Sequence, residues 1–483
     1  MAFQDLRAFI DHIEQQGQLR RIQVEVDPHL EITEIADRVM KADGPALLFE
    51  NVKGSDVPLA INLLGTQQRM AWALGMDDWS ELETRIEHLL NLAMSPPPAG
   101  IWGKLRTLGE IVHIGRIGPR TVRAGPVQDV VETSAPTLDG LPIPTCWPED
   151  GGPYITMPLV FTHDPASGKR NMGMYRLQVF DSQTLGMHWQ LHKGGAEHWR
   201  RSGEASTRME VAIAIGADPV LLYSATAPLP PDVDELVFAG FLRGSSVEMV
   251  PAQTVDILVP ARAEIVLEGY VDPAESRMEG PFGDHVGYYS LAEPYPVFHL
   301  TAVTRRRDPV YVSTIVGRPP MEDGWIGKAT ERLFLPLVRL VIPEIVDMNL
   351  PVHGVFHNFA IVSIRKRYPG QARKVMHAIW GTGQLMFTKY VIVVDADVDV
   401  HDLSEVLWRV GANTDPGRDT EHAQGVMDAL EFATTHANVG GKLGIDATRK
   451  LPEEGFPREW PPDIVMDEDV VRRVDERWTS YGI

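Results

Sequence analysis

Two carboxylates on a glycine-rich stretch are the residues of this sequence best suited to acid–base chemistry. Glu279 and Asp284 are separated by a rigid Gly-Pro pair, a phenylalanine and a flexible glycine. Such a turn can direct both side chains into one cavity. Like charges held close raise one of the two pKa values, so that one acid stays protonated near neutral pH and can donate a proton. In a solvated loop the same residues would be ordinary surface acids, and the residues alone leave both interpretations open.

Three other segments each carry one side chain that could bind a metal ion, namely Asn171, His192 and Glu235. An amide oxygen, an imidazole and a carboxylate suit a divalent ion such as Mn2+ or Mg2+, with phosphate oxygens and water completing an octahedron. Their spacing is not diagnostic, because a single histidine among the 16 of this chain is more often structural than a ligand.

The composition excludes several classes of protein. A net charge of −21 repels phosphate backbones, so nucleic acid is not an expected partner. The start of the chain does not resemble a secretory signal and no stretch of about eighteen apolar residues occurs, which predicts a cytoplasmic protein. The single cysteine, Cys146, rules out an internal disulfide or a thiolate zinc site and is expected to be buried. The motifs of nucleotide hydrolases, dinucleotide-binding proteins, zinc proteases and serine hydrolases are absent.

The elements that must position these residues form an α/β protein with a β-rich middle. Helical and strand patterns alternate over the first hundred residues and stop at the Pro-rich stretch 95–100. Short strands rich in Val, Ile, Tyr and Phe then dominate residues 122–315 and suggest a barrel-like arrangement. Afterwards the α/β alternation resumes, with helices expected around 331–340, 372–380 and 403–410, strands at 359–364 and 390–394, and a terminal helix with apolar Val470, Val471, Val474 and Trp478.

Taken together, these segments resemble the UbiD family of prenylated-flavin-dependent decarboxylases over nearly the whole chain. The matching stretches, in order, are Val26–Asp37, Gly44–Glu50, Thr145–Asp150, Asn171–Arg176, Ala263–Gly269, Glu279–His285, Gly317–Pro320 and Gly444–Thr448.

The resemblance implies a fold of three domains and a terminal helix. An N-terminal α/β domain is expected over residues 1–115 and a central split β-barrel domain that binds prenylated FMN over 116–320. A C-terminal α/β domain would follow over 321–462. A C-terminal oligomerisation helix over 463–483 would dock on a neighbouring subunit of a homodimer or homohexamer.

The resemblance also implies a role for individual residues. Arg176, Glu279 and Asp284 match the catalytic trio, with Asp284 where some relatives carry Glu. Asn171, His192 and Glu235 match the ligands of a manganese ion that binds the flavin phosphate, and carbonyl groups of residues 224–227 match a potassium site beside it. The other positions that match the cofactor site are Met174, Tyr175, His188, Trp189, Gln190, Lys193, Gly194 and Lys389.

The implied reaction is loss of CO2 from an aromatic acid, for which prenylated FMN serves as the electron sink. Arg176 would orient the substrate carboxylate and hold Glu279 by a charge-assisted hydrogen bond, and Asp284 would return a proton. The sequence leans toward a 1,4-dihydroxy-6-naphthoate type of acid in menaquinone synthesis, with 3-polyprenyl-4-hydroxybenzoate of ubiquinone synthesis as the alternative. A wide apolar pocket, a flavin prenyltransferase as cofactor supplier and transient contact with a membrane surface are expected.

Two alternatives of another class are an FMN-dependent oxidoreductase and a non-catalytic flavin carrier. The acid pair argues against both, because hydride transfer does not need it and a carrier would have no use for the complete trio.

Overall fold

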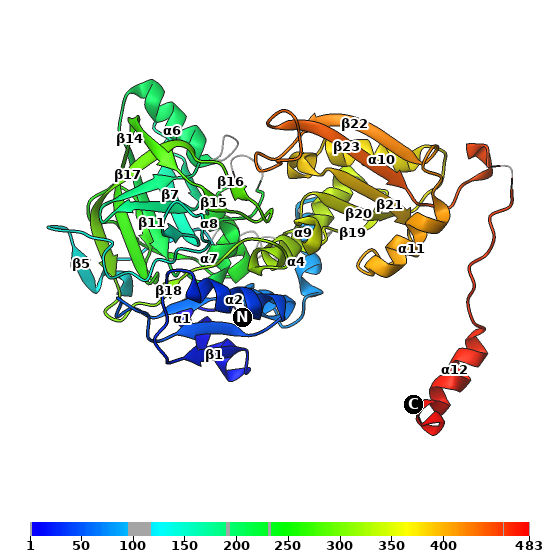
Figure 1. Cartoon of the computed structure of the whole chain (residues 1–483), viewed down its shortest axis with the longest axis horizontal. Coiled ribbons are helices and arrows are strands. Elements are labelled where there is room, and N and C mark those ends of the chain that lie inside the picture. Colours follow the sequence, from blue (N-terminus) through cyan, green and yellow to red (C-terminus); the bar gives the residue numbers. More distant parts are fainter. Residues whose placement is uncertain (1, 95–116, 190–193, 230–232, 457, 483) are drawn as a thin grey trace, which may run out of the picture.

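The computed structural model describes residues 2–94, 117–189, 194–229, 233–456 and 458–482. Three regions built around sheets follow one another along the chain (Figure 1). The N-terminal region lies beneath the central one, and the C-terminal region lies beside them, across helices α4 and α9. This agrees with the predicted α/β protein with a β-rich middle.

The N-terminal region begins with the helix that the apolar spacing predicts. Helix α1 (Leu6–Gln15) buries Leu6, Phe9, Ile10 and Ile13 and ends before Gly17, which has a φ of +70°. The Asp5 side chain caps its first turn. The remaining elements are β1 (Leu19–Ile22), α2 (Glu31–Lys41), β2 (Ala46–Phe49), β3 (Leu59–Ile61), α3 (Gln67–Ala73) and α4 (Glu81–Met94).

A late strand completes the N-terminal sheet. Its strand order is β1-β2-β3-β18, and β18 (Tyr311–Val312) pairs in parallel with β3. Residues 311–312 fall inside the range expected for the central domain, so the chain returns to the N-terminal sheet before it leaves the central region. The two regions are therefore tied together by backbone hydrogen bonds.

The central region is one large sheet of nine strands among the described residues, eight of which pair along an open path that does not close into a barrel. Its order is β6-β9-β10-β17-β14-β11-β7-β8, with β5 also on β17. The strands are β5 (Val130–Glu132), β6 (Tyr154–Ile155), β7 (Pro158–His163), β8 (Arg170–Gly173), β9 (Leu177–Asp181), β10 (Thr184–Met187), β11 (Met209–Ile215), β14 (Ile265–Glu279) and β17 (Glu293–Arg305).

Smaller elements surround this sheet. They are β4 (Arg120–Thr121), α6 (Gly194–Ala205), α7 (Pro219–Ser224), α8 (Glu235–Arg243), β12 (Glu248–Pro251), β13 (Leu258–Pro260), and the hairpin of β15 (Phe282–Gly283) and β16 (Tyr289–Ser290).

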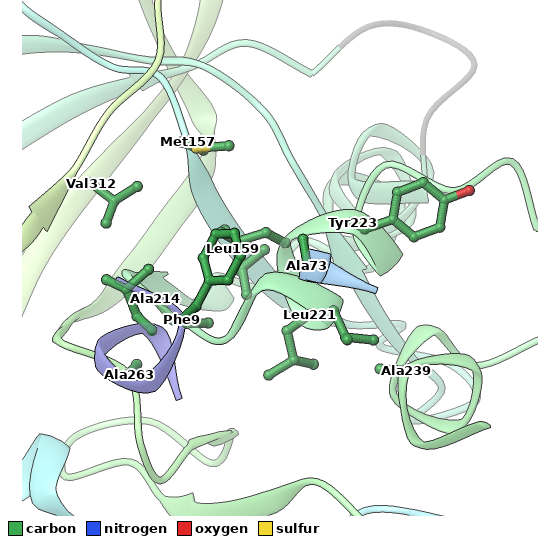
Figure 2. Close-up of a cluster of buried hydrophobic side chains, with 14 of the residues drawn as sticks. Phe9, Ala73, Met157, Leu159, Ala214, Leu221, Tyr223, Ala239, Ala263 and Val312 are labelled. Atoms are coloured by element: carbon green, nitrogen blue, oxygen red, sulfur yellow. The ribbon is translucent and has the colours of Figure 1, made fainter. Parts of the chain in front are cut away.

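The N-terminal and central regions share one hydrophobic core. Figure 2 shows part of it, where Phe9 of α1 and Ala73 of α3 lie among side chains of the central strands and of α7 and α8. Leu159, Ala214 and Leu221 in this cluster are at most 1% exposed. Burial of apolar surface on both sides of the boundary makes the two regions one packing unit.

The C-terminal region has a mixed five-stranded sheet with its own core among the described residues. The predicted strands at 359–364 and 390–394 and the helices at 372–380 and 403–410 are confirmed to within a few residues. The elements are β19 (Ile345–Asn349), β20 (Phe359–Ile364), α10 (Gln371–Trp380), β21 (Tyr390–Asp395), α11 (Leu403–Asn413), β22 (Thr420–Val426) and β23 (Val439–Asp446).

Helix α9 (Glu322–Val341) joins the two cores. Ala329 and Leu333 belong to the shared N-terminal and central core, whereas Leu335 and Val338 belong to the C-terminal core. The helix is twice as long as the predicted one at 331–340, because its first half contains two glycines that weaken the helical signal.

The chain ends in α12 (Glu468–Arg477), which extends away from the rest of the molecule (Figure 1). Its Val471 and the following Trp478 are exposed, as are Ile464 and Val465 in the segment that leads to it. Among the described residues, no helix is long and apolar enough to span a bilayer.

Candidate active site

Arg176 lies between the two acids singled out in the sequence. Its Nε and Nη2 donate to the two carboxylate oxygens of Glu279 at 3.0 and 3.2 Å, and its Nη1 donates to Asp284 Oδ2. Nη2 also donates to Ser290 Oγ at 2.9 Å, and the guanidinium carbon lies 4.5 Å from the centre of the Phe282 ring. Glu279 is 0% and Asp284 7% exposed, so a buried cation is held by two buried anions.

Three strands and one small hairpin bring these side chains together. Arg176 follows β8 and directly precedes β9, and Glu279 is the last residue of β14. Asp284 lies in the turn of the β15–β16 hairpin, where Ser290 ends the second strand. The arrangement depends on pairings between segments about a hundred residues apart, which local sequence patterns do not report.

The turn that carries the two acids needs its glycines. Gly280 has a φ of +97°, a conformation that L side chains rarely adopt. A Cβ on Gly283 would lie 2.2 Å from Trp147, whose ring covers the hairpin. The Asp150 carboxylate accepts the Gly283 and Trp147 backbone N–H groups and so fixes the ring relative to the turn.

The electrostatics differ from the expected raised pKa of one acid. Burial alone raises the pKa of Glu279, but the His188 hydrogen bond and the Arg176 charge outweigh it and hold this pKa below its usual value. For Asp284, burial is likewise outweighed by the His285 hydrogen bond and charge and by Arg176, and the pKa is lowered well below the usual range. The prediction of a raised pKa is wrong for this state, because a cation separates the two acids.

His188 supports the buried end of this cluster. Its Nδ1 lies 3.0 Å from Glu279 Oε2, and its ring packs against Tyr295 with 4.3 Å between centroids. His188 thus contacts the same carboxylate as Arg176, and both were predicted at the site.

A second group of predicted residues forms a tight cradle beside the first. Asn171 Nδ2 donates to the Tyr175 hydroxyl at 3.2 Å, and this hydroxyl also accepts the Gly195 backbone N–H at 3.3 Å. A Cβ on Gly194 would lie 2.0 Å from Asn171 Oδ1. The start of α6 can approach Asn171 only because position 194 is glycine.

Trp189 provides a buried donor at this cradle. A Cβ on Gly195 would lie 2.6 Å from Trp189 Nε1, and this N–H has no hydrogen-bond partner within the part of the chain that the structure describes. A buried donor without a partner favours an acceptor on a bound molecule.

Glu235 and Met174 link the cradle to α7 and α8. The Glu235 carboxylate accepts the Met172 backbone N–H at 3.2 Å, and burial raises its pKa to about 7. The Met174 backbone N–H donates to the Ala225 carbonyl at 3.2 Å, within the segment expected to bind potassium. Because the neighbouring groups offset little of the cost of burying this negative charge, the Glu235 carboxylate favours a nearby cation.

The structure places one predicted residue elsewhere and does not describe three others. Gln190, His192 and Lys193 lie outside the described residues, and among the others no three His, Cys, Asp or Glu side chains form a group that could hold a metal. Lys389 pairs with Glu431 and lines a different cavity together with Lys442. The structure therefore does not join Lys389 to the Arg176 cluster.

A cavity of about 560 Å3 adjoins the site between the central region, α9 and the C-terminal region. His285, the neighbour of Asp284, lines it, as does Met174. One face of α9 supplies much of its wall, at positions 323, 326, 327, 330, 331, 334, 337, 338 and 341.

Three residues at the site were not assigned a role from the sequence. Ser290 binds Arg176, and His285 binds Asp284. His357 comes from the C-terminal region and reaches His285. His285 follows an expected catalytic acid directly and could have been suspected, whereas His357 is 72 positions away and carries no local signal.

Family profiles match most of the chain. The N-terminal, Rift-related and C-terminal domains of 3-octaprenyl-4-hydroxybenzoate carboxy-lyase, called UbiD, match residues 10–89, 120–319 and 324–447.

Individual proteins are similar over almost their whole length. An uncharacterized protein of Archaeoglobus fulgidus is 52% identical over 99% of both chains. The UbiD-class enzyme HmfF from Pelotomaculum thermopropionicum in complex with FMN has 32% identity and a TM-score of 0.80 over 95% of this chain and 97% of its own. An evolved dimeric form of HmfF is known with prFMN. Vanillic acid decarboxylase of Sedimentibacter hydroxybenzoicus, in its closed form, has 28% identity and a TM-score of 0.86 over 99% of both chains.

Proposed function

Since this chain belongs to the UbiD family of carboxy-lyases, we propose that it removes the carboxyl group of an aromatic acid as CO2 with the help of prenylated FMN. The observation that carries this proposal is the buried Arg176, held by Glu279 on one side and Asp284 on the other at the edge of an apolar cavity. The same family membership argues against an oxidoreductase or a flavin carrier.

The residues of the cradle fit the phosphate end of the cofactor. Asn171, Tyr175 and the start of α6 lie in close contact, Trp189 offers an N–H, and the buried carboxylate of Glu235 favours a divalent cation such as Mn2+ or Mg2+. We propose that Asn171 and Glu235, with His192, hold that cation, and that carbonyl groups of residues 224–227 hold a potassium ion. Bound prenylated FMN would supply the electrophilic sink for the electron pair that CO2 leaves behind.

Arg176 would bind the carboxylate of the substrate. Its charge is now shared between Glu279 and Asp284, so an incoming carboxylate must compete with an internal one. Glu279 holds the guanidinium through two hydrogen bonds and is itself fixed by His188. The carboxylate would therefore be oriented by a group that does not need to reorganise.

Asp284 would return the proton to carbon after CO2 has left. In the substrate-free state it is ionised, because Arg176 and His285 lower its pKa. A substrate carboxylate that draws on Arg176 removes part of this stabilisation and adds a negative charge nearby. Both effects raise the pKa of Asp284 and favour its protonated form.

The cavity supports a substrate with a long apolar substituent. The lining positions on α9 extend from Asp323 to Val341, a rise of roughly 27 Å at 1.5 Å per residue. Asp323 lies near His285 at one end, and Val341 is 65% exposed at the other. A single ring would leave most of this apolar wall uncovered.

We therefore propose a prenylated 1,4-dihydroxy-6-naphthoate type of acid, in menaquinone synthesis, as the substrate. The runner-up is 3-polyprenyl-4-hydroxybenzoate, in ubiquinone synthesis. A flavin prenyltransferase would supply the cofactor, and the protein would act in the cytoplasm with transient contact to membranes that contain the acid. The exposed apolar side chains of the tail, among them Ile464, Val471 and Trp478, support assembly into a homodimer or homohexamer.

The test is to express the chain together with a flavin prenyltransferase and to measure CO2 release from naphthoic and hydroxybenzoic acids, each with and without a prenyl chain. Release from the prenylated naphthoic acid above all others is expected. Release only from the hydroxybenzoic acids would favour the runner-up, and no release from any acid by flavin-loaded protein would contradict the proposed function.

A further inference from the structure

Two histidines from different regions of the chain meet beside Asp284. His285 Nδ1 lies 2.8 Å from Asp284 Oδ1, and its Nε2 lies 3.1 Å from His357 Nε2. The backbone N–H of His285 donates to the same Oδ1 at 2.8 Å. Both ring nitrogens of His285 are thus engaged, one by the acid of the active site and one by the C-terminal region.

The loop that carries His357 is held in an uncommon conformation. Val355 and Phe356 have φ values of +57° and +35°, and a positive φ is rare for a β-branched or aromatic residue. Phe356 stacks on the His285 ring with 5.4 Å between centroids. Such strain persists only where the surroundings impose it, and it often marks a functional position.

Two glycines of α9 let this loop come close. A Cβ on Gly324 would lie 2.5 Å from Val352, and one on Gly327 would lie 2.9 Å from Phe356. The loop therefore lies directly against the first half of α9, which also lines the cavity. The position of His357 is fixed by this contact and not by the His285 hydrogen bond alone.

We propose that His285 supplies Asp284 with the proton used in each turnover, and that His357, from the C-terminal region, holds His285 in the orientation and charge state that this transfer needs. This inference rests on the proposed decarboxylation. His285 is then a proton-supplying residue that acts through Asp284, and His357 is a positioning residue.

A substrate carboxylate on Arg176 raises the pKa of Asp284, which then takes the Nδ1 proton of the His285 imidazolium. His285 becomes neutral and keeps its Nε2 proton in the hydrogen bond to His357 Nε2. The electron pair that CO2 leaves on carbon takes the proton of Asp284, which becomes a carboxylate again. A proton from water restores the imidazolium, so that each CO2 released consumes one solvent proton.

The charges around His285 favour its imidazolium form. Burial lowers its pKa, but the hydrogen bond and charge of Asp284 outweigh this, and Asp323 of α9 and Asp428 of the C-terminal region add to the increase, so that the pKa is raised above its usual value. His357 faces its other nitrogen, and Arg176 lies beyond Asp284. Because the protonated ring is the active form, the supply is present below this raised pKa and is lost as the pH rises through it.

Replacement of His285 tests the supply of protons. In flavin-loaded protein that decarboxylates one of the acids above, His285→Asn should lower kcat about 100-fold, with KM and cofactor content nearly unchanged. The decline of kcat at alkaline pH should disappear, because asparagine does not titrate. A kcat close to that of the unchanged protein, or an unchanged pH profile, would overturn the proposal.

Two variants of His357 distinguish its hydrogen bond to His285 from the packing of its ring. His357→Phe keeps an aromatic ring and removes the acceptor, and it should move the alkaline decline of kcat to lower pH. His357→Gln offers an amide oxygen to His285 and should restore most of the loss. His299→Asn is the matched control, because His299 also pairs with a carboxylate, that of Glu275 at 2.6 Å, but outside the cavity.

A measurement without turnover separates this inference from the proposed function. In the full-length protein with 15N-labelled histidine, the resonances that His285→Asn removes should titrate with a midpoint above the usual value of a histidine, and with a lower midpoint in His357→Phe. A midpoint of His285 at or below the usual value overturns the proton supply whatever the protein decarboxylates. If instead no acid releases CO2, the proposed function fails and the transfer to carbon fails with it, even where the titration is as expected.

Discussion

At the scale of single residues, the arginine between two acids explains why the free site is stable and yet ready for an anion. Arg176 is held by Glu279, Asp284 and Ser290, so each charge of this buried cluster has a partner. The substrate carboxylate has to replace one of these contacts. Asp284 is the contact most easily released, because it binds through one oxygen whereas Glu279 binds through two.

The role of Asp284 can be tested with two substitutions of similar size. Asp284→Asn keeps the shape but cannot supply a proton, so kcat should fall by roughly 10²- to 10⁴-fold while the flavin stays bound. Asp284→Glu keeps an acid and should retain much more activity. Absorbance of the bound flavin and CO2 release are measured on the same samples, and undiminished turnover of the Asn variant would remove Asp284 from the mechanism.

Asp323 gives a prediction about stability and pH. Burial raises its pKa to about 7, so the ionised carboxylate destabilises the folded protein above that pH. As the pH falls from about 7 toward the usual value of an aspartate, the folded state takes up the proton first and this cost disappears. Asp323→Asn should therefore raise Tm most at pH 8 and clearly less at pH 5, as thermal unfolding at both pH values would reveal. An equal shift at both would contradict the assignment.

At the scale of elements, helix α6 contains one glycine whose lack of a side chain is required by a close contact, Gly194, and one for which it is not, Gly203. Gly194→Ala would place a methyl group 2.0 Å from Asn171 Oδ1, whereas Gly203 has only a Pro273 carbon, 3.6 Å away. Gly194→Ala should therefore purify with little flavin and metal. Gly203→Ala should keep both and gain about 0.5–1 kcal/mol of stability from its helix propensity. Flavin absorbance and metal analysis of the two variants decide this, and equal loading would argue against the cradle.

Helix α9 offers a matched pair for the apolar wall. Val341 lines the open end of the cavity, whereas its neighbour Leu340 is half-exposed and does not line it. Val341→Trp should lower kcat/KM for prenylated acids by roughly tenfold and leave short acids unaffected. Leu340→Trp should change neither. If both variants act alike, the substituent does not run along α9.

The same elements show what the sequence could predict. The helix at Leu6–Gln15 and the strand at Phe359–Ile364 have clear apolar periodicity, because each buries one face or is buried throughout. The first half of α9 gave no such signal, since Gly324 and Gly327 serve a tertiary contact at the expense of helix propensity.

As with the helices and strands, only part of the site could be predicted from the sequence. The resemblance suggested Arg176, Glu279 and Asp284, and the structure brings them into contact. That a cation would separate the acids and lower both pKa values could not be read from a turn motif. The part played by His357 depends on how two regions meet, which no local pattern encodes.

At the scale of the whole molecule, the tail is the part without a packing partner within the described chain. The segment before α12 is anchored by Asp463, which pairs with Arg409 and Arg449, whereas the apolar side chains beyond it face solvent. Exposed apolar side chains on a long extension suit exchange between subunits.

Removal of residues 467–483 tests this while keeping the anchor at Asp463. The truncated chain should form a smaller assembly than the full chain, because the apolar residues of α12 no longer contact a neighbour. Light scattering after size-exclusion chromatography gives both masses, and an unchanged mass would exclude α12 from assembly. The midpoint of thermal unfolding at low concentration serves as the control for folding.

A boundary at residue 321 would separate α9 from the core of the preceding regions, in which Ala329 and Leu333 pack. We propose that the four predicted ranges describe the order of the regions along the chain, and that α9 belongs to two of them in space.

The reacting groups and the apolar wall of the cavity come from different regions of the chain, and this affects how the substrate preference of such a protein can evolve. The reacting groups and the cradle come from the central region, in part from the short segment Asn171–Arg176, while the apolar wall comes from α9 and the C-terminal region. Mutations along α9 can therefore alter which acid is accepted without disturbing the step that breaks the carbon–carbon bond. A library restricted to the outward half of α9 is where new substrate preferences should be sought, and the segment Asn171–Arg176 is where variation should be least tolerated.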